Sequence, residues 1–296
     1  MELKNSFGRD PSGAGPFRLA RKVGYRLRAL YRAMRITNPV TWIFGAQYRV
    51  ATDLIEIDLT YLCNLQCNNC NRSSAQAPET LHLQLDQLEA FVAQSLLQGR
   101  IWRRIRILGG EPTLHPHFHE AIALLEPLRT RTPDMLIEVV TNGYGDKVRQ
   151  ALARLPAHVA VENSNKSGAL QPHFGAFNMA PQDSWWHRLA DYRNGCEIVR
   201  SCGIGLTPTG YYQCAVAGGI DRVTREGHGR TVLPAADDEM RDLMDRTCRL
   251  CGRFRDGHFI PFNFRKPLLT QQTSPSWQRI YGAWWRRQSV AREEQV

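Results

Sequence analysis

A repeated alternation of short apolar segments with longer helical segments constrains the fold of this 296-residue chain most. The apolar segments begin at Ile55, Arg106, Leu136 and His158, and the helical segments are Gln84 to Gln98, His117 to Leu128 and Gly145 to Leu155. Strands that alternate with helices of about ten to fifteen residues form βαβ units and a parallel sheet. The sequence therefore predicts an α/β fold, with Phe174 to Asn178 as a candidate fifth strand.

Three cysteines follow the first predicted strand at the spacing C-x3-C-x2-C, namely Cys63, Cys67 and Cys70. A [4Fe–4S] cluster has four irons, so three protein thiolates leave one iron open to a small molecule. A structural zinc site instead needs four closed ligands. The odd number of thiolates therefore favours an iron–sulfur cluster with an open position.

Glycine and polar residues follow the other three predicted strands. They are Gly109, Gly110, Glu111, Thr141, Asn142, Glu162 and Ser164. Glycines let the backbone approach a ligand closely, and a carboxylate accepts hydrogen bonds from an ammonium group. Because parallel barrels place their chemistry just after the strands, we expect these residues to surround a ligand together with the cysteines.

These motifs resemble the cluster motif and the Gly-Gly-Glu motif of the radical S-adenosylmethionine (SAM) superfamily. The resemblance implies a partial, open (β/α) TIM-like barrel in which the open iron binds the amino and carboxylate groups of SAM. It also implies that the Gly-Gly-Glu turn holds the methionine amine. Thr141 and Asn142 would contact the ribose and carboxylate of SAM, and Glu162 or Ser164 would add a ribose contact.

Five further cysteines lie in the C-terminal half, at Cys196, Cys202, Cys214, Cys248 and Cys251. Residues 204–214 predict a β-hairpin that turns at 208–210, and residues 237–247 predict a short helix. A hairpin, a helix and four cysteines resemble the Twitch module of radical SAM enzymes, with a spacing similar to that of amino-cyclitol dehydrogenases. The resemblance implies an auxiliary [4Fe–4S] cluster on Cys196, Cys214, Cys248 and Cys251, although four thiolates also suit structural zinc.

Cys202 is the surplus cysteine of this half, and three roles are open for it. It could be a small buried hydrophobic residue. It could replace Cys196 as a cluster ligand, since it also precedes the hairpin. It could also donate a hydrogen atom to a substrate radical, as a thiol does in radical epimerases.

The predicted organisation is a basic N-terminal arm over 1–50, the partial barrel over 51–190, the Twitch module over 191–265 and a tail over 266–296. The arm holds ten Lys or Arg against two acidic residues, whereas the middle of the chain is nearly neutral. General affinity for nucleic acid is therefore not indicated.

Six apolar residues of the arm share one helical face, namely Ala20, Val23, Leu27, Leu30, Tyr31 and Met34. A basic amphipathic helix of this kind can pack on its own domain, rest peripherally on an anionic membrane or bind an acidic partner. We expect packing on the domain, with Trp284 to Arg287 as its contact.

No apolar segment approaches the roughly 20 residues of a membrane span, and the N-terminus lacks the apolar region of a signal peptide. Eight cysteines in a chain without an export signal indicate metal ligands and a reducing compartment. We therefore expect a cytoplasmic protein.

The segment from Lys166 to Arg193 is long and irregular, and loops of this length are often functional. We expect it to cover the mouth of the barrel and to contact the substrate. Lys166, His173, Asp183 and Arg188 are candidates for a base that removes a proton from a substrate radical.

The leading hypothesis is oxidation of a small polyol, sugar or cyclitol-like substrate. A flavodoxin or ferredoxin-type donor would supply the electron that cleaves SAM, and the resulting 5′-deoxyadenosyl radical would remove hydrogen from the substrate. The auxiliary cluster would then accept the second electron. The alternatives are epimerisation with Cys202 as the hydrogen donor, radical modification of a ribosomal peptide, and a zinc-binding interaction protein without catalytic activity.

Overall fold

The computed structural model describes residues 16–164, 177–257 and 273–293. Its strands are β1 (Leu54–Thr60), β2 (Arg104–Gly109), β3 (Leu136–Thr141), β4 (Val159–Asn163), β5 (Ile204–Thr207) and β6 (Gly210–Tyr212). Its α-helices are α1 (Pro16–Arg35), α2 (Asn38–Phe44), α3 (Leu85–Leu97), α4 (Phe118–Ala123), α5 (Glu126–Arg131), α6 (Asp146–Ala153), α7 (Glu197–Ser201), α8 (Ala215–Thr224), α9 (Arg241–Cys248), α10 (Gly252–Asp256) and α12 (Pro275–Glu293). None of the described helices is long and apolar enough to cross a membrane.

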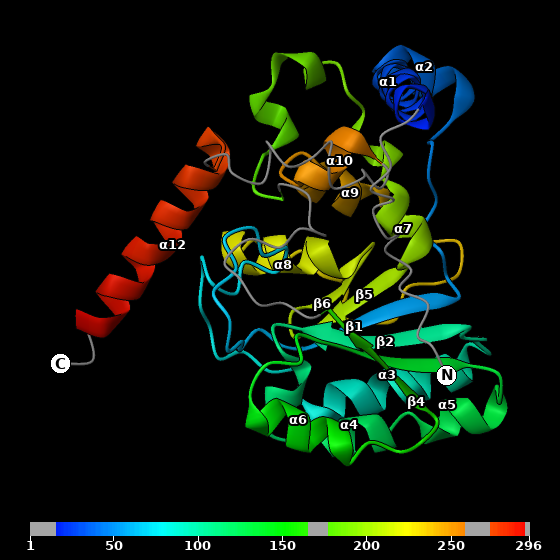
Figure 1. Ribbon diagram of the computed structural model, residues 1–296, viewed down its shortest axis with the longest axis vertical. Coiled ribbons are helices and arrows are strands. Elements are labelled where there is room, and N and C mark those ends of the chain that lie inside the picture. Colours follow the sequence, from blue (N-terminus) through cyan, green and yellow to red (C-terminus); the bar gives the residue numbers. More distant parts are fainter. Residues whose placement is uncertain (1–15, 165–176, 258–272, 294–296) are drawn as a thin grey trace.

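One six-stranded sheet organises the molecule, in the order β4-β3-β2-β1-β5-β6. All neighbouring pairs are parallel except β5 and β6, which are antiparallel. Helices α3 to α6 cover one face of the sheet, and α7 to α10 lie on the other (Figure 1). The predicted α/β fold with a partial, open barrel is confirmed.

The two faces of β1 differ because successive side chains of a strand point to opposite sides. Ile55 and Ile57 belong to the hydrophobic core together with Phe91 of α3. Glu56 points to the other face, where its partner in register, Gly205 of β5, lies against the first residue of α8. We call this second face of the sheet the inner face.

The predicted hairpin is confirmed, since β5 and β6 pair through Thr207 and Gly210. Because β5 also pairs with β1, the hairpin extends the main sheet. Strands on both sides of the boundary predicted between the barrel and the Twitch module, at residues 190 and 191, therefore belong to one sheet. The candidate fifth strand is not found in its described part, where Phe177 and Asn178 form a turn; residues 174–176 lie outside the described residues.

Two helix predictions need correction, and five of the described α-helices were not predicted, namely α2, α7, α8, α10 and α12. The helix expected at 117–128 is interrupted because Pro127 lacks the N–H that would bond the carbonyl of Ala123, where α4 ends. The helix expected at 237–247 begins only at Arg241. Helix α8 was missed because it contains two adjacent glycines, of which Gly218 packs so closely that a Cβ would lie 2.4 Å from Thr207.

Helix α1 packs on the domain as predicted, but the described part of its apolar stripe does not make the contact. Leu27, Leu30 and Met34 are exposed, as is the rest of the described apolar stripe. The opposite face of the helix makes the contact, through the buried side chains of Arg32 and Ile36. Trp284 was expected to contact α1, but its indole N–H instead donates to Glu79.

Candidate active site

The turn after β2 is packed directly against the start of the cysteine loop. The backbone N–H of Gly110 donates to the carbonyl of Thr60 at 2.7 Å, and that of Glu111 donates to the carbonyl of Leu62 at 2.8 Å. A Cβ on Gly110 would lie 2.3 Å from the Leu62 oxygen. The glycine therefore lets the turn approach the protein's own backbone closely, and its approach to a ligand stays a prediction.

Glu111 is fully buried, and both of its oxygens are engaged within the protein. Oε1 accepts hydrogen bonds from the hydroxyls of Thr113 at 2.7 Å and Thr141 at 2.9 Å. Oε2 accepts from the backbone N–H of Asn142 at 2.8 Å. The carboxylate therefore joins the ends of β2 and β3, and its contact with an ammonium group stays a prediction.

The end of β3 is in turn bonded to the cysteine loop. The side-chain amide of Asn142 donates to Oδ1 of Asn64 at 2.8 Å, and its nitrogen lies 3.9 Å from the sulfur of Cys63. The hydroxyl of Ser164, after β4, donates to the carbonyl of Thr141 at 2.7 Å. The structure thus brings together most of the residues predicted after the strands, with Glu162 as the exception.

The three cysteines of the loop suit a thiolate-bound cluster. Cys67 is buried, whereas Cys63 and Cys70 are partly exposed, and none of the eight cysteines is in a disulfide. The backbone N–H of Leu65 approaches the sulfur of Cys63 at 3.5 Å. Backbone N–H donors stabilise thiolates, and partial exposure gives a metal centre access to a small-molecule ligand.

A second group of four thiols lines one small buried cavity. Its cysteines are Cys196, Cys214, Cys248 and Cys251, which come from the starts of α7 and α8, the end of α9 and the start of α10. Burial, assisted by the other three cysteines, raises the pKa of the Cys214 thiol well above its ordinary value. A bound metal centre would offset this cost by taking the thiolate forms, so the four residues fit a closed four-thiolate site.

Cys202 does not belong to this second group. Its thiol lies beside the carboxylate of Glu56, and burial, together with that negative charge, raises its pKa to about 12. The alternative in which Cys202 replaces Cys196 as a ligand is therefore wrong, because Cys196 lines the cavity and Cys202 faces Glu56.

A charged network on the inner face was missed by the sequence analysis. Arg106 of β2 bonds Glu56 of β1 at 2.9 Å and Glu138 of β3 at 2.8 Å, and it also bonds Glu162 of β4. The signal was present in the sequence, because charged residues alternate with apolar ones in strands that otherwise read as buried. Glu162 thus pairs with Arg106 below the strand ends.

The network continues to Arg72, which follows the cysteine loop. Its guanidinium bonds Glu56 at 3.1 Å and both oxygens of Asp58 at 3.1–3.3 Å. Burial raises the pKa of Asp58 to about 6, against the opposing charge of Arg72. Four carboxylates therefore share two guanidinium groups, and the network leaves a net negative charge on this face.

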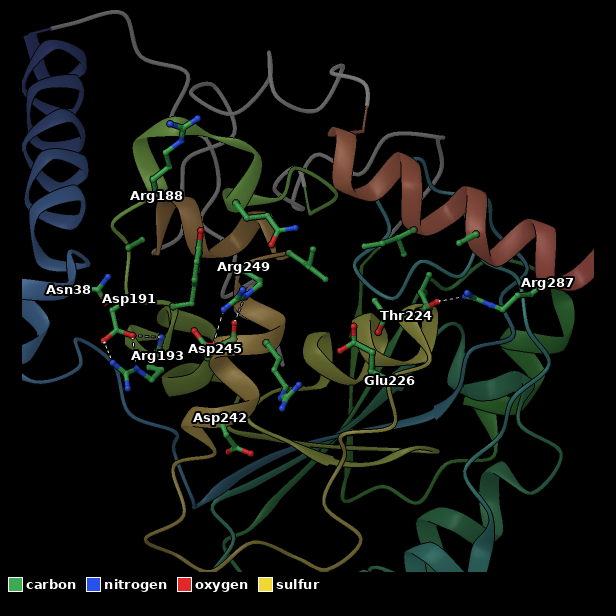
Figure 2. A pocket seen from close by; sticks show the side chains of 18 residues that line it. Asn38, Arg188, Asp191, Arg193, Thr224, Glu226, Asp242, Asp245, Arg249 and Arg287 are labelled. Carbon is green, nitrogen blue, oxygen red and sulfur yellow. Dashed lines mark hydrogen bonds and ion pairs between the residues drawn. The ribbon is translucent and has the colours of Figure 1, made fainter.

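The predicted bases do not reach the strand ends in the described residues. Lys166 and His173 lie outside the described residues. Asp183 accepts hydrogen bonds from the backbone N–H and the hydroxyl of Ser276, so it caps α12; these bonds outweigh burial and lower its pKa. Arg188 borders a charged surface groove of about 1120 Å³ between α9 and α12, together with Arg249 (Figure 2).

Comparison with known proteins shows what one part of the chain is similar to. Residues 57–164, which include the three-cysteine loop and all of β2 to β4 up to Ser164, match the model of the Radical SAM superfamily. The GTP 3′,8-cyclase of Chlorobaculum tepidum is 36% identical over 92 residues, which cover 31% of this chain and 26% of that protein. The GTP 3′,8-cyclase of Mannheimia succiniciproducens is 29% identical over 110 residues, 36% of this chain and 30% of that protein. The chain thus matches less than a third of the length of these curated relatives.

Among solved structures, BtrN in complex with AdoMet and 2-DOIA superposes with a TM-score of 0.38 at 16% identity, over 75% of this chain and 89% of that one. An open conformation of BtrN gives a TM-score of 0.35 at 18% identity, over 74% of this chain and 86% of that one.

Proposed function

We propose, from the premise that residues 57–164 are a radical SAM superfamily domain, that this chain is an enzyme that oxidises a small hydroxyl-rich substrate. The observation that carries the proposal is the packing of the three-cysteine loop against the ends of β2 and β3. This packing supports a SAM-dependent centre at the strand ends, where parallel barrels place their chemistry.

Cys63, Cys67 and Cys70 would hold the cluster that binds SAM. When bound, the cluster and SAM supply a 5′-deoxyadenosyl radical, which removes a hydrogen atom from an unreactive carbon. The chain itself positions these groups: Asn142 orients the loop beside Cys63, and Glu111 holds Asn142 in place. A flavodoxin or ferredoxin-type protein is the proposed electron donor.

The second thiol group favours oxidation over other outcomes. Cys196, Cys214, Cys248 and Cys251 would hold an auxiliary [4Fe–4S] cluster, and four thiolates leave no iron open to the substrate. A closed cluster of this kind can act as a one-electron acceptor. Oxidation of a CH–OH group to a carbonyl removes one hydrogen atom, one proton and one electron. The 5′-deoxyadenosyl radical would take the hydrogen atom, an acceptor of this kind would take the electron, and the proton would leave to solvent.

The inner-face network supports a neutral or cationic substrate rich in hydroxyl groups. Glu138 and Glu162 keep 17% and 21% of their side chains exposed, so a substrate could reach them, and carboxylates accept hydrogen bonds from hydroxyls. The curated relatives are GTP cyclases, but a triphosphate is disfavoured here because Arg72 and Arg106 are already engaged by four carboxylates.

Anaerobic reconstitution with iron and sulfide tests the two-cluster proposal. We expect about eight irons per chain and formation of 5′-deoxyadenosine from SAM. The triple variant with Cys63, Cys67 and Cys70 changed to alanine should keep about four irons and lose 5′-deoxyadenosine formation. The matched double variant of Cys248 and Cys251 should also keep about four irons but still cleave SAM. One tightly bound zinc in place of the second four irons would contradict the auxiliary cluster, and no SAM cleavage by the wild type would contradict the function.

Replacing Cys202 by alanine tests the epimerase alternative. Because the proposed oxidation needs no hydrogen donor, and the thiol lies beside Glu56 of the inner-face network, we expect unchanged turnover and an oxidised product. Mass analysis of the product reports a loss of two hydrogens for oxidation and no change in mass for epimerisation. If the wild type returned an epimer and the variant did not, Cys202 would be the hydrogen donor and the proposed oxidation would be wrong.

A further inference from the structure

Helix α1 is attached to the protein by the face opposite its apolar stripe. Arg32 is 2% exposed, donates to the carbonyls of Gly195 and Phe254, and stacks over the Phe254 ring. Ile36 lies one turn later and is also buried. Helix α1 therefore contacts the rest of the protein through a face that carries a buried guanidinium, where an amphipathic helix usually has apolar residues.

The apolar stripe itself is fully formed and faces outward. Val23, Leu27, Leu30 and Met34 follow one another at intervals of three or four residues, and Tyr31 is four residues after Leu27, so all five lie on one face. Each is about half exposed: Val23 49%, Leu27 61%, Leu30 58%, Tyr31 53% and Met34 53%. An amphipathic helix normally buries such a stripe, and a contiguous exposed patch of this size marks an interaction site.

Helix α2 adds three consecutive exposed residues to the patch. Trp42 is 88% exposed, Ile43 64% and Phe44 69%. The guanidinium of Arg35, in the last turn of α1, lies over the Phe44 ring and donates to the carbonyl of Gly45. This contact ties the end of α2 to α1, so the two apolar groups are neighbours. We call these eight residues of α1 and α2 the apolar patch.

The charged residues of the segment that carries the apolar patch are all positive. No aspartate or glutamate occurs from residue 11 to residue 50, a segment that contains eight Lys or Arg. Arg26 and Arg28 are exposed and flank the stripe on its two sides. Long basic side chains at the edges of an apolar face can reach lipid headgroups while the face enters the acyl boundary.

We infer that α1 and α2 dock this protein on an anionic lipid surface. The patch supplies the apolar area, an exposed tryptophan suited to the membrane interface, and flanking cations that match anionic headgroups. Self-association through the patch is disfavoured, because two copies placed face to face would bring these cations together without an acidic residue to pair them. The inference does not depend on the proposed reaction.

Vesicle flotation of the reconstituted protein tests the inference. We expect binding to phosphatidylcholine vesicles that contain phosphatidylglycerol, and binding at least about tenfold weaker without the anionic lipid or in high salt. The double variant Leu27→Glu with Leu30→Glu should lose binding by about tenfold or more, because two charges enter the buried face. Both residues are exposed, so folding and iron content should not change.

The matched control is Leu97→Glu, which adds a charge at an equally accessible leucine, 88% exposed, on α3. It should bind vesicles like the wild type. Failure of the wild type to bind anionic vesicles would overturn the inference, as would equal binding by the Leu27 and Leu30 double variant. Light scattering in solution tests whether a second copy of the chain occupies the patch instead. If the wild type were a dimer that did not bind vesicles, and the double variant were a monomer, the patch would be a dimer interface.

Discussion

Replacement of Gly110 by alanine should abolish SAM cleavage and lower the free energy of unfolding by about 3 kcal/mol. The added methyl group would lie 2.3 Å from the carbonyl oxygen of Leu62 and 2.8 Å from that of Tyr61. Both neighbours are backbone atoms at the start of the cysteine loop, so neither can rotate away. The variant can fold only by displacing the loop that carries Cys63, and the active site is lost with that displacement.

Urea unfolding and 5′-deoxyadenosine formation measure the two effects of this substitution. The matched control is Gly24→Ala in α1, where an added Cβ meets no atom within 4 Å. That control should be neutral or stabilising by up to about 1 kcal/mol, because alanine restricts the unfolded chain and favours a helix. Wild-type stability and SAM cleavage in the Gly110 variant would show that the contact between the turn and the loop is dispensable.

The parallel sheet and the cysteine groups could be predicted because their signals are local. Each apolar segment is followed by residues of restricted chemistry, and cysteines at C-x3-C-x2-C spacing have few alternative uses. The hairpin could also be predicted from its turn. Its position could not, since pairing of β5 with β1 depends on contacts between segments about 150 residues apart, as in the pair Ile55 and Ile204.

The roles of individual polar residues were less predictable. Asp183 was a reasonable candidate base by composition, but its partner Ser276 lies 93 residues away in a segment without a motif. Glu111 was assigned to a ligand by its position, and its buried bonds to Thr141 and Asn142 depend on how β3 ends. The apolar stripe of α1 was correctly found, but periodicity alone does not say which face of a helix the protein uses.

Replacement of Arg106 by alanine should lower the free energy of unfolding by about 3–5 kcal/mol. Arg106 is the shared partner of Glu56, Glu138 and Glu162, from three different strands. Its removal would leave three carboxylates facing one another on the inner face, and only Glu56 keeps a second guanidinium, that of Arg72. The loss should be measured by urea unfolding against Arg103→Ala, whose exposed pair with Asp53 should contribute less than about 1 kcal/mol.

The pH dependence of this loss distinguishes a charge network from simple packing. Burial raises the pKa of Glu162 even in the wild type, and Arg106 opposes that rise. Without Arg106, the pKa of Glu162 in the folded state should rise further above its unfolded value. A carboxyl whose folded pKa is raised stabilises the fold at low pH and loses this contribution as pH increases through the folded pKa. The stability gap between wild type and the alanine variant should therefore narrow as pH is lowered from about 8 to about 5.5. A gap that stays constant over this range would mean that Arg106 acts by filling space and not by neutralising the three carboxylates.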